Sequence, residues 1–450
     1  MNGRVVVVGG GVAGLATAHH LLRSGADPIV LERAETPGGV IAPPVRVGDL
    51  LLEPGPDSLA ARKPWGGELC GSLGLRLERP GASGAYLWTD RGLVPYPAGS
   101  AFGIPGDVGD VLRWPGLSSR GRLRALADLL KRTRRDGVEE TLGELLRRRL
   151  GGEATDAAIA PLLAGLHAGD VDRLSANATF PELVAWEESQ GSLIRGAQAA
   201  QRSARRAAPG PMFVRPWGGM RTLVDALAAE LGSRVRVDVE VVGVREHEVE
   251  LRDDVEPADA AVLACGAPAT SMLLGTNAPG GLAAIHAVST AVVFLVYPPG
   301  TADALPSGTG FVVPRGEAPM TAATFLSRKW PEERFGDRAV VRCFVGGAGA
   351  EDVLDEPDEE IVGACARHLA AVVDVGDPAS SHVHRWPHAM PQYELGHLER
   401  VSRIRDSLPA GIFVVGSAFD GVGVSDLARA AEETAARVRA FVGAPRKEPA

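Results

Sequence analysis

The 450-residue sequence has no long uninterrupted run of apolar residues. The longest one, residues 291–297, has the length of a β-strand, whereas a membrane-spanning helix needs about 20 apolar residues. Met1 to Gly3 lead directly into a strand-like segment, and the glycines after it interrupt the apolar stretch that a secretory signal requires. We therefore expect a soluble protein with neither a signal peptide nor a membrane span.

Cysteine is scarce, and its spacing excludes several classes of site. No pair forms a CxxC motif, and none of the ten histidines belongs to an HExxH motif. These spacings are the usual signs of redox and zinc sites. We expect no metal, inert thiols and a reducing cytoplasmic location. The four cysteines are Cys70, Cys265, Cys343 and Cys365.

Positive charge is in deficit, since 47 Lys and Arg residues face 56 Asp and Glu residues, for a net charge of −9. This balance disfavours non-specific binding to nucleic acid. A substrate with several carboxylates would need a cleft that gathers arginines against the overall sign. The apolar fraction of 45% is typical of a globular protein, and the length favours two or three lobes over one core.

The first motif that is present is a glycine-rich turn between a strand and a helix. Residues 4–8 (RVVVV) show the unbroken apolar pattern of a buried parallel strand, and GGGVAG follows at 9–14, before an apolar helical pattern. A GxGxxG turn in this setting lets a pyrophosphate approach a helix N-terminus. We predict a dinucleotide site at Gly9, Gly11, Val12, Ala13 and Gly14.

An acidic residue lies where such a site needs one. The next apolar run, PIVLE, ends in Glu32, which can accept hydrogen bonds from ribose hydroxyls and would repel the 2′-phosphate of NADP. The predicted cofactor residues in this part of the site are Glu32, Arg33 and Val239.

Two more glycine segments favour FAD over NAD. Gly38 and Gly39 form a turn shortly after Glu32, and many flavoproteins have such a turn beside the cofactor. Near the C-terminus, a strand at 412–415 precedes glycines and a helix at about 424–441, which offers a second helix N-terminus to the phosphate and ribityl groups. The alternative is a last strand–helix unit without ligand contact. The C-terminal residues predicted to contact FAD are Gly416, Gly421, Val422, Gly423 and Val424.

The remaining chain predicts a three-part α/β protein. It comprises a discontinuous FAD-binding Rossmann-like domain, a β-rich substrate domain and an inserted helical domain. Residues 118–150 and 156–168 have helical periodicity, residues 234–246 and 248–253 predict a β pair, and 258–265 predict a strand that returns to the cofactor sheet. The predicted segments are 1–60, 210–270 and 391–443 for FAD binding, 61–100 and 271–390 for substrate, and 101–195 for the helical domain.

Longer motifs along the chain resemble a known family. The segments 5–22 and 30–41 resemble the start of amine-oxidase-like flavoproteins. More specific segments resemble the porphyrinogen oxidases, and most closely the coproporphyrinogen III oxidases of Gram-positive bacteria, with protoporphyrinogen IX oxidases as near relatives. These segments are EPGPDSLAARKP (53–64), RGLVPYP (91–97), PLLAGLHAGDVDRLSANATFPEL (161–183), GSLIRG (191–196), RWPHAMPQYELGHLERV (385–401) and GSAFDGVGVSDLARA (416–430).

The resemblance implies an oxygen-dependent flavin oxidase of haem biosynthesis. It would dehydrogenate a porphyrinogen in successive two-electron steps and release hydrogen peroxide, with a ferrochelatase as a possible transient partner. Ser417 and Ser425 depart from the Asn and Pro that are common in the family at these places, so a shifted substrate or a lowered activity stays open.

The chemistry asks little of the side chains, because the cofactor carries the hydride transfer. Lys63 is the candidate catalytic residue, as a positioned cation or a proton acceptor, with Arg62 as a weaker option; an exposed loop lysine is the alternative. Arginines pair bidentately with carboxylates, and those in or beside the family-like motifs are the candidates for substrate binding, unless they form surface ion pairs. They are Arg91, Arg195 and Arg215.

Other assignments remain open at this point. Trp217 and Tyr393 could stack on a macrocycle or pack in the core. An amine oxidase, a carotenoid-type desaturase and a non-catalytic FAD-binding relative are alternative functions. The sequence does not decide between coproporphyrinogen and protoporphyrinogen.

Overall fold

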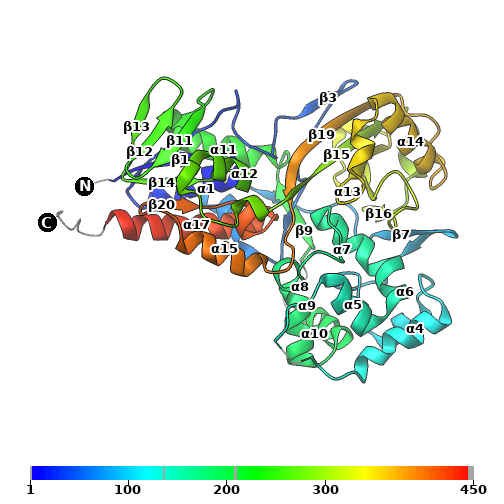
Figure 1. Cartoon of the computed structure of the whole chain (residues 1–450). Coiled ribbons are helices and arrows are strands. Elements are labelled where there is room, and N and C mark those ends of the chain that lie inside the picture. Colours follow the sequence, from blue (N-terminus) through cyan, green and yellow to red (C-terminus); the bar gives the residue numbers. More distant parts are fainter. Residues whose placement is uncertain (1–2, 135–136, 207–209, 444–450) are drawn as a thin grey trace.

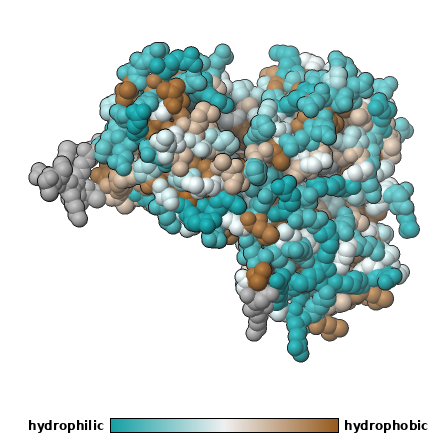
Figure 2. Space-filling model, in the orientation of Figure 1, coloured by the Kyte–Doolittle hydropathy of each residue, from teal (hydrophilic) through white to brown (hydrophobic). Residues whose placement is uncertain are grey.

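The computed structural model describes residues 3–134, 137–206 and 210–443. Figure 1 shows three lobes: one around β1 and β14, a second around β15 and β19, and a third made of the helices from α4 to α10. The face drawn in Figure 2 is mostly hydrophilic, with small scattered hydrophobic areas. Within the described residues, no helix combines the length and the apolar character needed to cross a membrane.

The first lobe, called here the Rossmann-like lobe, is built on a five-stranded parallel sheet. Val5, Val6 and Val7 are fully buried, because helices or loops cover both faces of the sheet. This double burial explains the unbroken apolar run in the sequence. In spatial order, the strands are β10 (Val235–Arg236), β2 (Asp27–Leu31), β1 (Arg4–Val8), β14 (Ala260–Leu263) and β20 (Ile412–Val414).

Different helices cover the two faces of this sheet. The face that carries Val5 and Val7 packs against α1 (Val12–Arg23), α11 (Arg221–Leu231) and α17 (Val424–Val442). The face that carries Val6 and Val8 packs against α12 (Ala267–Leu274), α15 (His397–Asp406) and the three-stranded sheet of β11 (Val241–Arg245), β12 (Glu248–Leu251) and β13 (Val255–Pro257).

The structure corrects one predicted β pair. Residues 234–246 do not form one strand, because Asp238 has a φ of 57° and turns the chain. Val235 and Arg236 before the turn join the parallel sheet beside β2, and only the part after it pairs with β12. The predicted strands near 4–8, 28–32, 258–265 and 412–415 are confirmed.

The second lobe has a seven-stranded, mainly antiparallel sheet. One face packs against α14 (Asp358–Ala370), and the other against the hairpin of β3 (Val45–Val47) and β4 (Leu50–Leu52). The strands in spatial order are β19 (Ser380–Pro391), β15 (Ala287–Val296), β18 (Val340–Gly346), β17 (Ala322–Phe325), β16 (Gly310–Val312), β7 (Tyr86–Thr89) and β8 (Gly92–Pro95).

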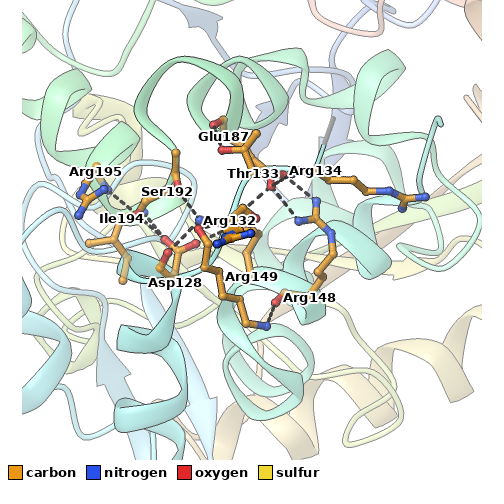
Figure 3. A network of polar contacts seen from close by, with 12 residues as sticks. Asp128, Arg132, Thr133, Arg134, Arg148, Arg149, Glu187, Ser192, Ile194 and Arg195 are labelled. Carbon is orange, nitrogen blue, oxygen red and sulfur yellow. Dashed lines mark hydrogen bonds and ion pairs between the residues drawn. The ribbon is translucent and has the colours of Figure 1, made fainter. Parts of the chain in front are cut away.

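The third lobe is helical and contains a buried network of charged side chains (Figure 3). The Arg149 side chain is fully buried, and its Nε donates to Asp128 at 2.5 Å while a second nitrogen donates to Glu187 at 3.3 Å. Asp128 also accepts hydrogen bonds from Ser192 and from the backbone of Ile194. The helices are α3 (Val108–Arg113), α4 (Ser119–Leu126), α5 (Leu142–Leu150), α6 (Gly152–Ala154), α7 (Ala160–His167), α8 (Ala176–Thr179), α9 (Pro181–Gln190) and α10 (Leu193–Arg206).

Short elements connect the lobes. A small sheet of β5 (Leu59–Ala60), β9 (Phe213–Pro216) and β6 (Leu77–Glu78) lies beside α2 (Pro64–Ser72). The remaining helices are α13 (Leu326–Lys329), next to β18, and α16 (Ser417–Asp420), after β20. The predicted domain boundaries remain a prediction.

Candidate active site

The glycine-rich turn after β1 has the geometry of a phosphate-binding loop. Gly9 has a φ of 109°, and an added Cβ at Gly14 would lie 2.0 Å from the Gly9 carbonyl oxygen. At Gly11 an added Cβ would meet no atom within 4 Å. Gly11 is the N-cap of α1, and no side chain accepts a hydrogen bond from the first N–H groups of this helix. This arrangement suits an anion at a helix N-terminus.

The predicted ribose-binding residue lies directly beside this turn. Glu32 Oε2 accepts a hydrogen bond from the Gly10 N–H at 2.7 Å, and Oε1 accepts one from the Ala34 N–H at 2.8 Å. Val239 is held here as well, since its N–H donates to the Glu32 carbonyl. The carboxylate is thus oriented by the backbone and keeps further lone pairs for hydroxyl donors. Arg33 is next in the chain and exposed.

The second glycine turn packs against the first. The Gly38 N–H donates to the Gly10 carbonyl at 2.8 Å, and Gly38 forms a β-bridge with Gly11. An added Cβ at Gly39 would come within 3.3 Å of the Gly11 Cα. The structure therefore brings the two N-terminal glycine segments together.

The C-terminal glycine segment follows β20, at the same carboxyl edge of the parallel sheet as the first turn. Gly416 has a φ of 135°, and an added Cβ there would meet nothing within 4 Å. Gly423 is the N-cap of α17, again without a side-chain cap. Between them, Gly421 packs on Asp426. Two uncapped helix N-termini thus belong to one sheet edge, which is a donor set that fits a dinucleotide with two phosphates.

Asp420 helps to hold this second segment. One of its oxygens accepts the Gly416 N–H at 3.0 Å, and the other is ion-paired with Arg405. These contacts make Asp420 a turn residue that fixes the backbone of the segment.

Lys63, the predicted catalytic residue, is joined to the C-terminal segment. Its Nζ donates to both carboxylate oxygens of Asp426 at 2.8 and 2.7 Å. Asp426 lies in the first turn of α17, directly after the glycines. The Lys63 side chain is 38% exposed. The ammonium group is thus a positioned cation, and no sequence motif indicated its partner.

A buried aromatic group links this region to the other two lobes. Tyr393, which follows β19, donates its hydroxyl to the Ser417 carbonyl and stacks on His397 at 4.2 Å between ring centroids. The His167 ring contacts Tyr393 edge-on at 5.7 Å. Burial, with a smaller effect of the Lys63 charge, lowers the pKa of His167 to about 4. Tyr393 is only 3% exposed, so of its two predicted roles it takes core packing in this structure.

The three predicted substrate arginines differ in how free they are. Arg91 lies exposed in the turn between β7 and β8, and Arg195 lies exposed on α10. Arg215, in β9, is only 5% exposed. It pairs with Glu78 at 2.6 Å and Glu332 at 3.1 Å. Its guanidinium therefore already has carboxylate partners within the protein, which the sequence motif did not reveal.

The segment 53–59, which belongs to a family-like motif, accepts hydrogen bonds from two different parts of the structure. Glu53 accepts the N–H groups of Met220 and Arg221 from the start of α11. Asp57 accepts the Lys329 ammonium at 2.8 and 2.9 Å. Burial acts to raise the pKa of Asp57, but the Lys329 and Arg342 charges outweigh it and hold that pKa well below its usual range. The motif thus joins the Rossmann-like lobe to the second lobe.

Two aromatic and basic candidates lie at the surface. Trp217 is 62% exposed, with the Arg76 guanidinium 5.1 Å from its ring centroid. Arg62 lies 5.0 Å from the Phe102 ring centroid. Both side chains are in cation–π contacts.

The chain is similar to known flavoproteins over almost its whole length. Residues 12–439 match the family described as flavin-containing amine oxidoreductase. The coproporphyrinogen III oxidase of Bacillus subtilis is 32% identical, with 94% of this chain and 95% of the relative covered. That of Mycobacterium tuberculosis H37Rv is 33% identical, with 93% of each chain covered.

Solved structures agree with this family. A crystal structure from Exiguobacterium sp. 255-15, provisionally described as a protoporphyrinogen oxidase, superposes with a TM-score of 0.84 at 30% identity. The superposition covers 98% of this chain and 99% of that one. The α/β fold predicted from the sequence is confirmed, and the family implies a flavin cofactor and an oxidoreductase activity. The chain therefore belongs to the flavin-containing amine oxidoreductases and, within them, to the porphyrinogen oxidase family.

Proposed function

We propose that this protein is an FAD-dependent coproporphyrinogen III oxidase that uses oxygen as the electron acceptor and works in the cytoplasm in haem biosynthesis. The observation that carries the proposal is the pair of uncapped helix N-termini, of α1 and α17, at one edge of the parallel sheet. The similarity to coproporphyrinogen III oxidases over nearly the full length supports the choice of substrate.

We assign the cofactor contacts in two groups. The first group would hold the ADP half of FAD, with Glu32 on the ribose and the N–H groups of α1 on the pyrophosphate. The second would contact the pyrophosphate and the flavin from the start of α17. The first group is Gly9, Gly11, Val12, Ala13, Gly14, Glu32, Arg33, Gly38, Gly39 and Val239; the second is Gly416, Gly421, Val422, Gly423 and Val424.

Bound FAD would supply the hydride acceptor, and the protein would supply position and charge. Lys63 is the side chain we assign to the reacting region. Its hydrogen bonds to Asp426 support a role as a fixed cation more than as a proton acceptor. A fixed positive charge would stabilise negative charge on the nearby cofactor without further reorganisation. Asp426 is then a positioning residue.

We assign recognition of the substrate's carboxylate groups to the exposed arginines. Arg91 and Arg195 remain candidates for the propionate groups, since both guanidinium groups are accessible. Arg215 would have to break its ion pair with Glu78 or Glu332 to bind substrate, so it is the weakest of the three candidates for substrate binding. Contact with a ferrochelatase would follow from the shared tetrapyrrole.

The first experiment is aerobic oxidation by the purified, flavin-loaded protein. Coproporphyrinogen III and protoporphyrinogen IX are offered separately, porphyrin fluorescence is followed, and peroxide is measured. Faster formation of coproporphyrin III with peroxide release is the expected result. A preference for protoporphyrinogen IX would favour the second candidate function, in line with the description of the Exiguobacterium structure. No turnover of either substrate with flavin bound would leave a non-catalytic flavoprotein.

The Lys63 assignment has its own test. The K63M variant removes the charge and keeps most of the side-chain volume, so it should bind flavin and oxidise substrate about 10- to 100-fold more slowly. K63R is the matched control and should keep more activity than K63M. Equal oxidation rates for K63M and the wild type would show that Lys63 takes no part in the reaction.

A further inference from the structure

A cavity at the open edge of the Rossmann-like sheet lies outside the proposed active site. Its volume is about 310 Å³, which is at the lower end for small-molecule sites. It lies beside β20 and between the last turns of α15 and α17, two helices that run below the sheet in Figure 1. The lining residues used below are Arg405, Asp406, Leu408, Phe413, Arg437 and Phe441.

Two guanidinium groups line this cavity, against one carboxylate. Arg405 is ion-paired with Asp420, but its Nε is buried and has no hydrogen-bond partner in the described part of the chain. Arg437 donates to the Thr434 hydroxyl at 2.8 Å and forms no ion pair with any described residue. Asp406 is the one acidic residue on the wall. Asp420 balances the charge of Arg405, so the cavity offers the guanidinium of Arg437, which has no ion pair among the described residues, and the unused buried Nε donor of Arg405. A planar carboxylate is the natural partner of such forks.

The rest of the wall is apolar and aromatic. Phe413 from β20 and Phe441 from α17 meet edge-to-face, with ring centroids 5.9 Å apart. Leu408 contributes an aliphatic surface. A flat ring would bury apolar area here and gain aromatic contacts. The free guanidinium donors and the aromatic walls together favour a carboxylate with an aromatic body over inorganic phosphate.

We propose that this cavity binds a small aromatic carboxylate, with its carboxylate between Arg405 and Arg437 and its ring against Phe413 and Phe441. The site does not depend on the proposed oxidase activity. It is separated from the glycine segments by Asp420, which contacts Arg405 on one side and the Gly416 N–H on the other.

Calorimetric titration of the flavin-loaded protein tests this site, with 3-phenylpropionate as the probe. The probe should bind, and its neutral analogue 3-phenylpropanamide should bind at least about tenfold more weakly, because it lacks the charge-assisted hydrogen bonds. R437A should weaken probe binding by about 10- to 100-fold, R437K less, and F441A should also weaken it. R439A is the matched control, since Arg439 is exposed on the same helix and does not line the cavity.

Several results would overturn the proposal. These are no binding of the probe, equal binding of the acid and the amide, or equal binding by R437A and the wild type. Displacement of the probe by coproporphyrin III, with no effect of R437A, would place the probe in the porphyrinogen site instead. Visible absorbance of the flavin in each variant checks that the fold is retained.

A second measurement tests whether the cavity communicates with the cofactor. A carboxylate on Arg405 Nε would fix the guanidinium that holds Asp420, and through it the Gly416 N–H; this step rests on the proposed flavin contact of Gly416. Flavin should then bind about fivefold more tightly with the probe present, and D420N should abolish the gain. An unchanged flavin affinity at saturating probe would overturn the coupling, whereas the R437A titration judges the binding site independently of flavin.

Discussion

The helical lobe and the carboxyl edge of the Rossmann-like sheet differ in whether their hydrogen-bond donors have partners within the protein. In the helical lobe, the fully buried Arg149 has its donors taken up by Asp128, Glu187 and nearby carbonyl groups (Figure 3). At the sheet edge, Gly11 and Gly423 begin their helices with no side-chain cap. The donors in the helical lobe are therefore bonded within the protein, whereas those at the sheet edge are left for a ligand.

A cluster of charged residues can either hold helices together or bind a ligand, and the two lobes show the difference. Several basic residues lie close together in the sequence between 131 and 149, yet Arg149 is fully buried and Arg148 pairs with Glu140 and Glu187. Such a network holds the helices of one lobe together. Function is better indicated by donors that the fold leaves unused than by the number of charges.

The largest expected effect comes from breaking the buried network. R149M should lower the free energy of unfolding by about 3–5 kcal/mol, because Asp128 is left buried without its cation. Denaturant titration of the flavin-loaded protein measures this. R147A is the control: Arg147 is 37% exposed and pairs with exposed Asp156 and Asp172, so its loss should cost only about 0–1 kcal/mol. A loss below about 1 kcal/mol in R149M would contradict the distinction between the two regions.

The next effect concerns the junction between the two regions, where His167 and His397 flank Tyr393. Burial lowers the pKa of each imidazole to about 4, with smaller effects of nearby positive charges. The unfolded chain takes up these protons below about pH 6.5, and the folded chain does so only near pH 4. Stability is therefore full above about pH 6.5 and falls between pH 6.5 and 4, by about 2 kcal/mol per imidazole at pH 5.

Unfolding curves at pH 7.5 and pH 5 measure this loss. H167F should remove about half of the loss that the two imidazoles cause, because its ring cannot take up a proton. H286A, at an exposed histidine, should keep the wild-type dependence. The same pH dependence in H167F and the wild type would show that His167 carries a proton at pH 5 in the folded protein.

The smallest of the three effects sharpens the comparison at the sheet edge. G11A places a methyl group in open space, so the flavin-free protein should keep its stability while flavin binding weakens by about 10- to 100-fold through lost phosphate contacts. G14A instead drives a methyl group into the Gly9 carbonyl and should destabilise the fold itself. Flavin titration and thermal unfolding separate the two. Unchanged flavin affinity in G11A would show that the phosphates of the cofactor do not bind at this turn.

The sequence predicted the regular parts of the fold well. Buried parallel strands such as 4–8 can be predicted from unbroken apolar runs, and similar apolar runs between 288 and 346 form strands of the second sheet. β19 was missed, because its polar histidines and Pro387 hide a strand that lies at the sheet edge. A local bulge accommodates the proline, where His388 has a φ of 46°.

The candidate site was predictable only in its backbone elements. Glycines with a required conformation leave a spacing in the sequence, so the turns at 9–14 and 416–424 could be predicted. Side-chain partners do not leave such a pattern: Asp426 is 363 residues from Lys63, and Glu332 is 117 residues from Arg215. Their pairing follows from how the lobes meet, which no local motif encodes.

The order of strands in the parallel sheet has a consequence for synthesis of the chain. β1 and β2 are made first, but β14 pairs with β1 only after more than 250 residues, and β20 completes the sheet within the last 40. Until β14 is made the apolar strand β1 has one open edge, and until β20 is made β14 has one. Such an edge is the kind of surface that aggregates or recruits chaperones. A chain released before residue 412 would lack the C-terminal glycine segment and leave β14 unpaired on one side, so the Rossmann-like lobe is completed only after the second lobe has been made.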